Sequence, residues 1–199
     1  MLITISGQSG SGKSSTAQGL AKALRMPTVD VGQIFRGMAE KYGMTVGAFG
    51  LYAEKHRDVD EKLDQEMLKL ARRRKKLILQ GRLTGWMTFR HKVPAVRIWI
   101  GASLAVRARR VSGREGIPYR KAYQMIAKRD RDNVVRYKAT YGLDLNDLSV
   151  YDVVVQTDDL TVAQVVDSLV NSLKLWPKKS PRRKAQPKKR QPPKRRARQ

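Results

Sequence analysis

A pattern of glycine, lysine and serine near the start of the sequence is typical of phosphate binding. The pattern G-x-x-x-x-G-K-[ST] is matched over residues 7–14, which we call the phosphate loop. Its glycines permit positive φ angles and let several backbone N–H groups point at one polyphosphate. Lys13 would reach the β- and γ-phosphates of a nucleotide, and the Ser14 hydroxyl would hold Mg²⁺. The residues predicted to bind a nucleoside triphosphate are Gly7, Gln8, Ser9, Gly10, Ser11, Gly12, Lys13, Ser14 and Ser15.

The segments on either side of the phosphate loop supply the structure that it needs. Residues 2–6 form an apolar run typical of a buried strand, and residues 14 to about 25 are expected to form a helix. A helix that begins at the loop aims its positive end at the bound phosphates. The four fixed positions would match by chance in roughly 1% of chains of this length. Because the match also has the strand and the helix, we interpret it as a nucleotide site.

The composition bounds the size and the surroundings of the protein. A chain of 199 residues, 41% of them hydrophobic, can form one domain with an appendage. Cysteine is absent, which excludes disulfides and thiolate metal sites and fits a reducing compartment. The loop begins at residue 7, which leaves no room for a signal peptide, and no apolar run approaches membrane-spanning length. We therefore expect a cytoplasmic protein that does not bind membranes. We also expect it to be a monomer.

The net charge of +25 is unevenly distributed along the chain. Residues 177–199 contain twelve Lys or Arg and no acidic side chain, which leaves 30 basic and 17 acidic side chains for residues 1–176. The last 23 residues have too few apolar side chains to offset their ordering entropy, so we predict a disordered basic tail. Such a tail is suited to nonspecific binding of RNA or another polyanion, which high salt would weaken. The alternative is a solvated tail without a dedicated partner.

Strands and helices alternate through the rest of the sequence. Further strands are predicted at residues 26–31, 76–80, 95–100 and 151–156. Helices are predicted at residues 32–42, 44–55, 58–74, 118–141 and 161–175, with another that begins at residue 103 and breaks near Gly113. This alternation predicts an α/β protein of the three-layer P-loop NTPase type, in which helices flank a five-stranded parallel sheet. Ligands of such sheets bind at the carboxyl ends of the strands.

One acidic cluster and one tryptophan have simple structural explanations. Asp58, Asp60 and Glu61 begin a predicted helix, where the helix dipole alone accounts for negative charge. Trp99 lies inside a predicted strand and is expected in the core.

The remaining motifs separate this chain from most P-loop proteins. A GTPase should carry an Asn-Lys-x-Asp motif and a motor ATPase a strand that ends in Asp-Glu, whereas the third and fourth strands here end at Gln80 and Gly101. Instead, arginines gather on the strand ends and on residues 103–141. If the acceptor is itself a phosphate, such cations overcome the repulsion between two anions, and no general base is needed. This pattern favours a small phosphoryl transferase with a mobile lid.

Several segments beyond the phosphate loop resemble the archaeal-type cytidylate kinases. The resemblance covers residues 1 to about 175 and does not include the basic tail. The segments that carry it are residues 32–40 (GQIFRGMAE), 81–87 (GRLTGWM), 136–138 (RYK), 141–145 (YGLDL) and 148–152 (LSVYD). Gln80 departs from the family, in which an acidic residue often precedes this Gly-Arg, so Ser14 is left as the protein ligand for Mg²⁺.

The resemblance implies a nucleoside monophosphate kinase domain over residues 1–176, with an acceptor-binding region at about 30–75 and a lid at about 103–118. It implies in-line transfer of a phosphoryl group from ATP, with Mg²⁺, to CMP and dCMP. The residues implied for binding the acceptor are Asp30, Gly32, Arg36, Arg82 and Trp86. The residues implied for catalysis are Lys13, Arg82, Arg107, Arg110, Arg129, Asp132 and Arg136. The alternatives are an adenylate or other nucleoside monophosphate kinase, or an RNA- or ribosome-associated P-loop ATPase.

Overall fold

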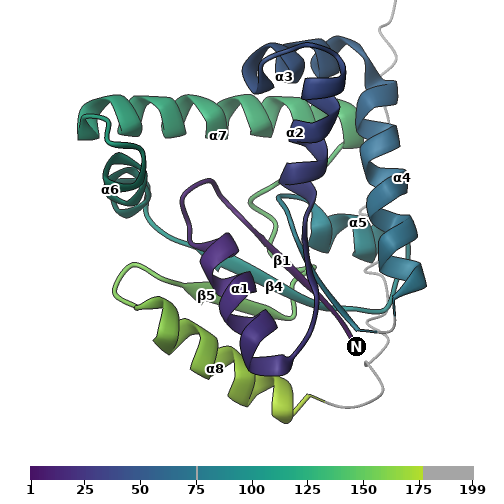
Figure 1. Ribbon diagram of the computed structural model, residues 1–199, viewed down its shortest axis with the longest axis vertical. Helices are drawn as coiled ribbons and strands as arrows, with labels where there is room; N and C mark the ends of the chain where they lie inside the picture. The colour runs from purple at the N-terminus through teal and green to yellow at the C-terminus, as the bar shows by residue number, and fades with distance from the viewer. Residues whose placement is uncertain (75, 177–199) are drawn as a thin grey trace, which may run out of the picture.

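Five parallel strands form the centre of the protein, as the computed structural model in Figure 1 shows. The structure describes residues 1–74 and 76–176, so the tail predicted at 177–199 lies outside the described residues. The strands are β1 (Leu2–Gly7), β2 (Thr28–Asp30), β3 (Leu77–Gln80), β4 (Val96–Gly101) and β5 (Val153–Gln156). Their spatial order is β2-β3-β1-β4-β5, and each neighbouring pair is parallel. The predicted fold class is confirmed, and β1 delivers the phosphate loop to the middle of the sheet.

Eight helices cover the two faces and the carboxyl edge of this sheet within the described residues. They are α1 (Lys13–Leu24), α2 (Val31–Lys41), α3 (Val46–Lys55), α4 (Arg57–Arg73), α5 (Thr84–Arg90), α6 (Leu104–Glu115), α7 (Tyr119–Tyr141) and α8 (Val162–Lys174). In Figure 1, α1 and α8 lie together beside the sheet, while the long helix α7 has α6 near its amino end. Among these helices, none combines the length and the apolar character that crossing a membrane requires.

The core lies on both faces of the sheet, and β1 is accordingly buried at all six of its positions. Ile3 and Ile5 of β1 point to one face, where they belong to the same core as Leu20 of α1 and Leu169 of α8. Leu2 points to the other face, where α4 and α5 cover the sheet. Burial on both faces is expected of a parallel sheet and explains the apolar run at the start of the chain. The phosphate loop therefore rests on a rigid base.

Two smaller cores lie beyond the carboxyl edge of the sheet. Helices α2, α3 and α4 surround Phe49 and Val59, both fully buried. Helices α6 and α7 pack against each other through Val111 and Ile126. These two units occupy the positions predicted for the acceptor-binding region and the lid, and that division of labour stays a prediction.

Helix α6 differs from the sequence prediction at its carboxyl end. It continues through Gly113 to Glu115 and ends at Gly116, whose φ of 63° is left-handed. A glycine inside a helix costs only about 1 kcal/mol relative to alanine. The packing of Ala108 and Val111 against α7 outweighs that cost. The predicted break near Gly113 therefore falls two residues before the end of the helix at Glu115.

Gly85, in α5, offers a test of how tightly the second sheet face is packed. A Cβ at this position would lie 2.3 Å from Cε1 of Tyr151, which is 3% exposed. Gly85→Ala should lower the free energy of unfolding by about 1–3 kcal/mol, because overpacking outweighs the gain in helix propensity. Gly113→Ala is the matched control, since its Cβ would meet nothing within 4 Å and should raise stability slightly. Urea unfolding followed by circular dichroism measures both, and equal stabilisation by the two variants would contradict this packing.

Candidate active site

The phosphate loop adopts a backbone conformation that only glycine accommodates without strain. Gly10 and Gly12 have φ angles of 78° and 95°. A Cβ at Gly7 would lie 2.1 Å from the carbonyl oxygen of Ile100 in β4, and one at Gly10 would lie 3.1 Å from that of Arg107 in α6. Gly12 is the N-cap of α1, where unpaired backbone N–H groups point outward. The loop is thus a close-fitting backbone cradle, which suits a polyphosphate.

Lys13 lies against the loop that precedes it. Its Nζ donates a hydrogen bond to the carbonyl oxygen of Gln8 at 2.5 Å. Removal of solvent by the surrounding protein atoms, followed by the positive charges of Arg82 and Arg129, lowers the pKa of Lys13 to about 7. Arg129 responds in the same way, because burial and then Arg82 lower its pKa to about 10. The three cations therefore form one electropositive cluster, which an anion would stabilise.

Arg82 connects the end of β3 to the phosphate loop. Its guanidinium donates to Ser9 Oγ at 2.8 Å and to Asn133 Oδ1 of α7 at 2.9 Å. Close to Arg82 in the chain, a buried hydroxyl pair joins the start of α5 to β1, with Thr84 Oγ1 and Ser6 Oγ 3.1 Å apart. Arg82 is thereby held between the loop and α7, where the sequence predicted a phosphate ligand. Asn133 was not predicted, although it belongs to the polar segment that follows Arg129.

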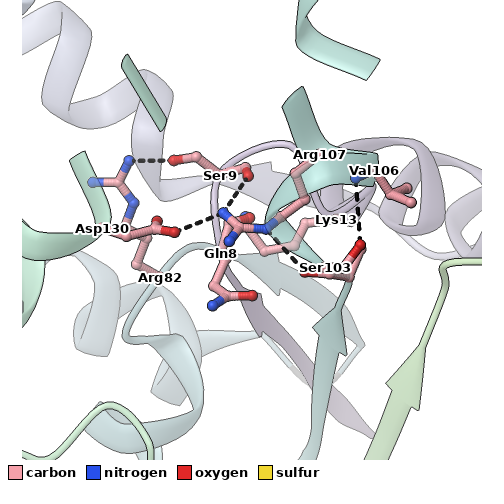
Figure 2. A network of polar contacts seen from close by, with 9 residues as sticks. Gln8, Ser9, Lys13, Arg82, Ser103, Val106, Arg107 and Asp130 are labelled. Carbon is pink, nitrogen blue, oxygen red and sulfur yellow. Dashed lines mark hydrogen bonds and ion pairs between the residues drawn. The ribbon is translucent and has the colours of Figure 1, made fainter. Parts of the chain in front are cut away.

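Arg107 lies on the other side of the same loop, as Figure 2 shows. Its side chain is 4% exposed. Nε donates to the carbonyl oxygen of Ala102 at 2.9 Å, and Nη1 donates to that of Ser9 at 3.2 Å and to Asp130 Oδ2 at 2.7 Å. Asp130 was missed by sequence reasoning, which selected Asp132. Arg107 is therefore bound to protein acceptors around the loop rather than directed into solvent.

Arg110, one turn further along α6, meets the carboxyl end of the loop. Its Nη1 donates to Thr157 Oγ1 at 2.9 Å and contacts the carbonyl oxygen of Ser11 at 3.4 Å. Its Nη2 donates to the carbonyl oxygen of Thr157 at 2.5 Å. Thr157 follows β5 and was not predicted either. A single threonine after a strand carries no signal in the sequence that would identify it.

The predicted residues of α7 separate onto different sides of the helix. Arg129 is largely buried and lies near enough to Arg82 for that positive charge to add to the effect of burial in lowering its pKa. Asp132 points elsewhere and forms an ion pair of 2.7 Å with Lys128, with 48% of its own side chain and 70% of the lysine exposed. The structure thus does not bring Asp132 together with the loop. At this point of the helix, Asp130 is the carboxylate that reaches the loop region, through its ion pair with Arg107.

Arg136 pairs with Asp60 of α4 through two hydrogen bonds, one of them 3.2 Å from Nε to Oδ2. Asp60 is 3% exposed, and the guanidinium carbon of Arg136 lies 5.6 Å from the ring centre of Phe35. The helix dipole alone therefore does not account for Asp60, and that prediction is wrong. The pair joins the α2–α4 unit to α7.

Apart from Arg82, the residues predicted to bind the acceptor fall into two groups. Asp30 is the N-cap of α2 and accepts hydrogen bonds from Gly32 N at 2.8 Å and from Arg36 at 3.1 Å. These three residues lie together at the carboxyl end of β2. Asp30 is near enough to Lys13 for its negative charge to oppose part of the lowering of the pKa of Lys13. Trp86 is separate, because it packs edge-on against Phe89 with ring centres 6.3 Å apart. A role in packing accounts for its position.

A cavity of about 210 Å³ lies beside the phosphate loop. It extends from the loop to α7 and to the segment that follows α7. Its lining includes Gly7, Gln8, Arg82, Asp130, Asn133 and Asn146. Of the three clustered cations, Arg82 therefore borders a space that a ligand can enter.

A glycine-rich phosphate loop at the end of the central strand, in a sheet of this order, defines a P-loop kinase fold. The solved structure of a shikimate kinase from Bacteroides thetaiotaomicron has this fold, with a TM-score of 0.59, 16% sequence identity, and coverage of 88% of this chain and 99% of that chain. The model of the cytidylate kinase-like family matches residues 2–159. The chain therefore belongs to the cytidylate kinase-like family, and the predicted resemblance is confirmed.

Two relatives illustrate the extent of this similarity. A cytidylate kinase from Sulfurisphaera tokodaii is 35% identical over 174 residues, which cover 86% of this chain and 96% of that protein. A cytidylate kinase from Pyrococcus abyssi is 40% identical over 157 residues, which cover 79% of this chain and 84% of that protein. The similarity thus extends far beyond the phosphate loop.

The lowered pKa of Lys13 predicts proton uptake when ATP binds. With a pKa of about 7, much of this amine is neutral at pH 8 in the free protein, and anionic phosphates should raise the pKa and favour its protonation. Isothermal titration calorimetry at pH 8, in buffers that differ in ionisation enthalpy, should therefore report uptake approaching one proton. Lys22→Met, a change on the exposed side of α1, should leave the uptake unchanged, whereas Lys13→Met should abolish it. Proton release by the unmodified protein would contradict the lowered pKa of Lys13 in the free protein.

Proposed function

We propose that the protein transfers the γ-phosphoryl group of ATP to CMP and to dCMP. The observation that supports this proposal is the hydrogen bond of 2.8 Å from Arg82 to Ser9 Oγ. It holds beside the phosphate loop an arginine that the family resemblance implies for binding the acceptor phosphate. The chain's own arginines supply the fixed cations that two adjacent anionic nucleotides require. The names of the relatives support CMP as the acceptor.

The residues around the loop divide between the two nucleotides. Residues 7–15 hold the phosphates of ATP, with Lys13 near the β- and γ-phosphates. Arg36 and Arg82, past the ends of β2 and β3, hold the phosphate of CMP, with Asp30 and Gly32 beside them. An oxygen of the CMP phosphate attacks the γ-phosphorus, and the bond from that phosphorus to the bridging oxygen of ADP breaks. The attacking oxygen is already an anion, so the side chains need only position it and neutralise charge.

Mg²⁺ fits the same loop through Ser14. Ser14 lies in the first turn of α1, directly after the glycine cradle. Within the residues that the structure describes, no group of three acidic or histidine side chains is arranged as a metal site. Ser14 would therefore hold the ion together with phosphate oxygens. When bound, Mg²⁺ neutralises negative charge on the donor phosphates.

A screen of acceptors tests the proposed substrate. With ATP and Mg²⁺, the purified protein should show the highest kcat/KM for CMP and dCMP among CMP, dCMP, AMP, GMP and UMP. Lys13→Met should abolish the activity, which controls for a contaminating kinase. Much faster phosphorylation of AMP, GMP or UMP would assign the protein to another monophosphate kinase. Release of ADP without any phosphorylated acceptor would favour a P-loop ATPase.

We also propose that residues 177–199 bind RNA or another polyanion without sequence preference. Their twelve basic and no acidic side chains support this, and they lie outside the described residues. Since both nucleotide sites come from a single chain, we propose that the enzyme acts as a monomer. The cysteine-free sequence supports a cytoplasmic location.

Removal of residues 177–199 should separate the two proposed activities. The shortened protein should keep kcat/KM for CMP within about twofold and lose the salt-sensitive retention of RNA that counterion release would drive. Filter binding at several salt concentrations measures that retention. An inactive but folded shortened protein would contradict the division, and unchanged RNA retention would assign any binding to residues 1–176.

A further inference from the structure

Thr157 lies where β4, β5 and the phosphate loop meet, and it is 3% exposed. Its backbone N–H donates to the carbonyl oxygen of Gly101, at the end of β4, at 2.9 Å. Its hydroxyl oxygen lies 3.0 Å from the same carbonyl oxygen and 3.2 Å from that of Ser11 in the loop. The hydroxyl can donate its one proton to either carbonyl and still accept a hydrogen bond. Thr157 therefore ties the loop to the edge of the sheet.

The same residue fixes the guanidinium of Arg110. The hydroxyl accepts from Nη1 at 2.9 Å, and the backbone carbonyl of Thr157 accepts from Nη2 at 2.5 Å. Binding both ends of the planar fork restricts its rotation. Nη1 also lies 3.9 Å from the position that a Cβ of Gly12 would occupy, at the N-cap of α1. The fork is therefore held beside the point at which the loop backbone would meet phosphates.

Arg110 retains donors for an anion in this arrangement. A guanidinium carries five N–H donors, and the contacts with Thr157 and Ser11 account for three of them. The remaining two can bind phosphate oxygens without loss of the contacts to Thr157.

The neighbouring residue holds the start of α6 in the same way. Asp158 Oδ1 accepts from the backbone N–H of Ser103 at 2.9 Å. Ser103 Oγ in turn caps the helix by accepting from Val106 N at 3.3 Å, a contact drawn in Figure 2. The segment after β5 thus fixes both the first turn of α6 and the arginine two turns along it.

We propose that Thr157 is a positioning residue for phosphoryl transfer and acts by orienting Arg110. This inference rests on the proposed function and on Arg110 being one of the catalytic residues that the family resemblance implies, here as a ligand of the transferring phosphoryl group. The hydroxyl of Thr157 keeps the guanidinium at the loop before the nucleotides bind, so that its charge needs no rearrangement as the transition state forms. A merely structural threonine would instead affect stability and leave the turnover of the folded enzyme unchanged.

Two substitutions isolate the hydroxyl. Thr157→Val replaces it with a methyl group of similar size, and kcat for CMP should fall about 10-fold to 100-fold, with KM for ATP changing less than about threefold. Thr157→Ser keeps the hydroxyl and should stay near the wild-type kcat. Thr157→Ala, which places no methyl group at the polar position, should show the same loss and replaces the valine variant if that one does not fold.

Thr161→Val is the matched control. Its hydroxyl accepts from Gln164 N at 3.3 Å as the N-cap of α8, in an exposed position. Loss of that cap should lower the melting temperature and leave kcat unchanged. Equal kcat in folded Thr157→Val and wild type would overturn the positioning role.

A double-mutant comparison tests the route through Arg110. If Thr157 acts by orienting this arginine, Thr157→Val should not slow Arg110→Met any further. Losses that multiply in the double variant would overturn the proposal. A wild-type protein that does not phosphorylate CMP would refute the proposed function, and both proposals would then fall. An active wild type with an equally active Thr157→Val refutes the positioning role alone.

Discussion

The burial of Lys13 and Arg129 beside each other and beside Arg82, with the mutual repulsion that adds to it, is the constraint on which the rest of the site depends. Burial and the neighbouring charges lower the pKa of Lys13 to about 7 and that of Arg129 to about 10. Such a cluster opposes folding unless rigid elements hold it, because like charges in a low dielectric repel strongly. The buried strand β1 and the Ser6–Thr84 hydroxyl pair provide that rigidity. Bound phosphates would relieve the repulsion, so part of their binding energy comes from the protein's own unfavourable charge.

Arg107 and Arg110 leave one helix, yet their surroundings give them different tasks. Arg107 is almost fully enclosed, and its contacts with Ala102, Ser9 and Asp130 hold the outer side of the loop. Arg110 lies at the loop's carboxyl end and keeps donors available beyond those bound by Thr157. A helix places residues three apart on adjacent parts of one face, so a single element can both brace the cradle and contribute charge to it.

The fold was accessible from the sequence because each element had a periodic or terminal signal of its own. The apolar run at residues 2–6 and the glycines of the loop determine the central strand and its turn. The family motifs predicted Arg82 as a residue of the site. The partners of the arginines carry no such signal. Asp130 and Asp132 are the same residue type two positions apart, so the sequence does not distinguish them. Only the rotation of α7 against α6 determines that Asp130 contacts Arg107. The roles of Thr157 and Asp60 are likewise defined by long-range contacts. Thr157 and Arg110 are 47 positions apart in the sequence, and Asp60 and Arg136 are 76 positions apart.

Helix α4 shows why such contacts matter for the site as a unit. Asp60 pairs with Arg136, and one turn later Asp64 accepts a hydrogen bond of 2.5 Å from the hydroxyl of Tyr141. Burial raises the pKa of Asp64 to about 6, so this carboxylate is held at a cost that the tyrosine hydrogen bond partly offsets. Separating a buried ion pair leaves two uncompensated charges, which costs far more than opening an exposed one. Helices α4 and α7 are therefore joined at two successive turns. The unit formed by α2, α3 and α4 and the helix that carries Arg129, Asp130 and Asn133 are therefore held in a fixed position relative to each other.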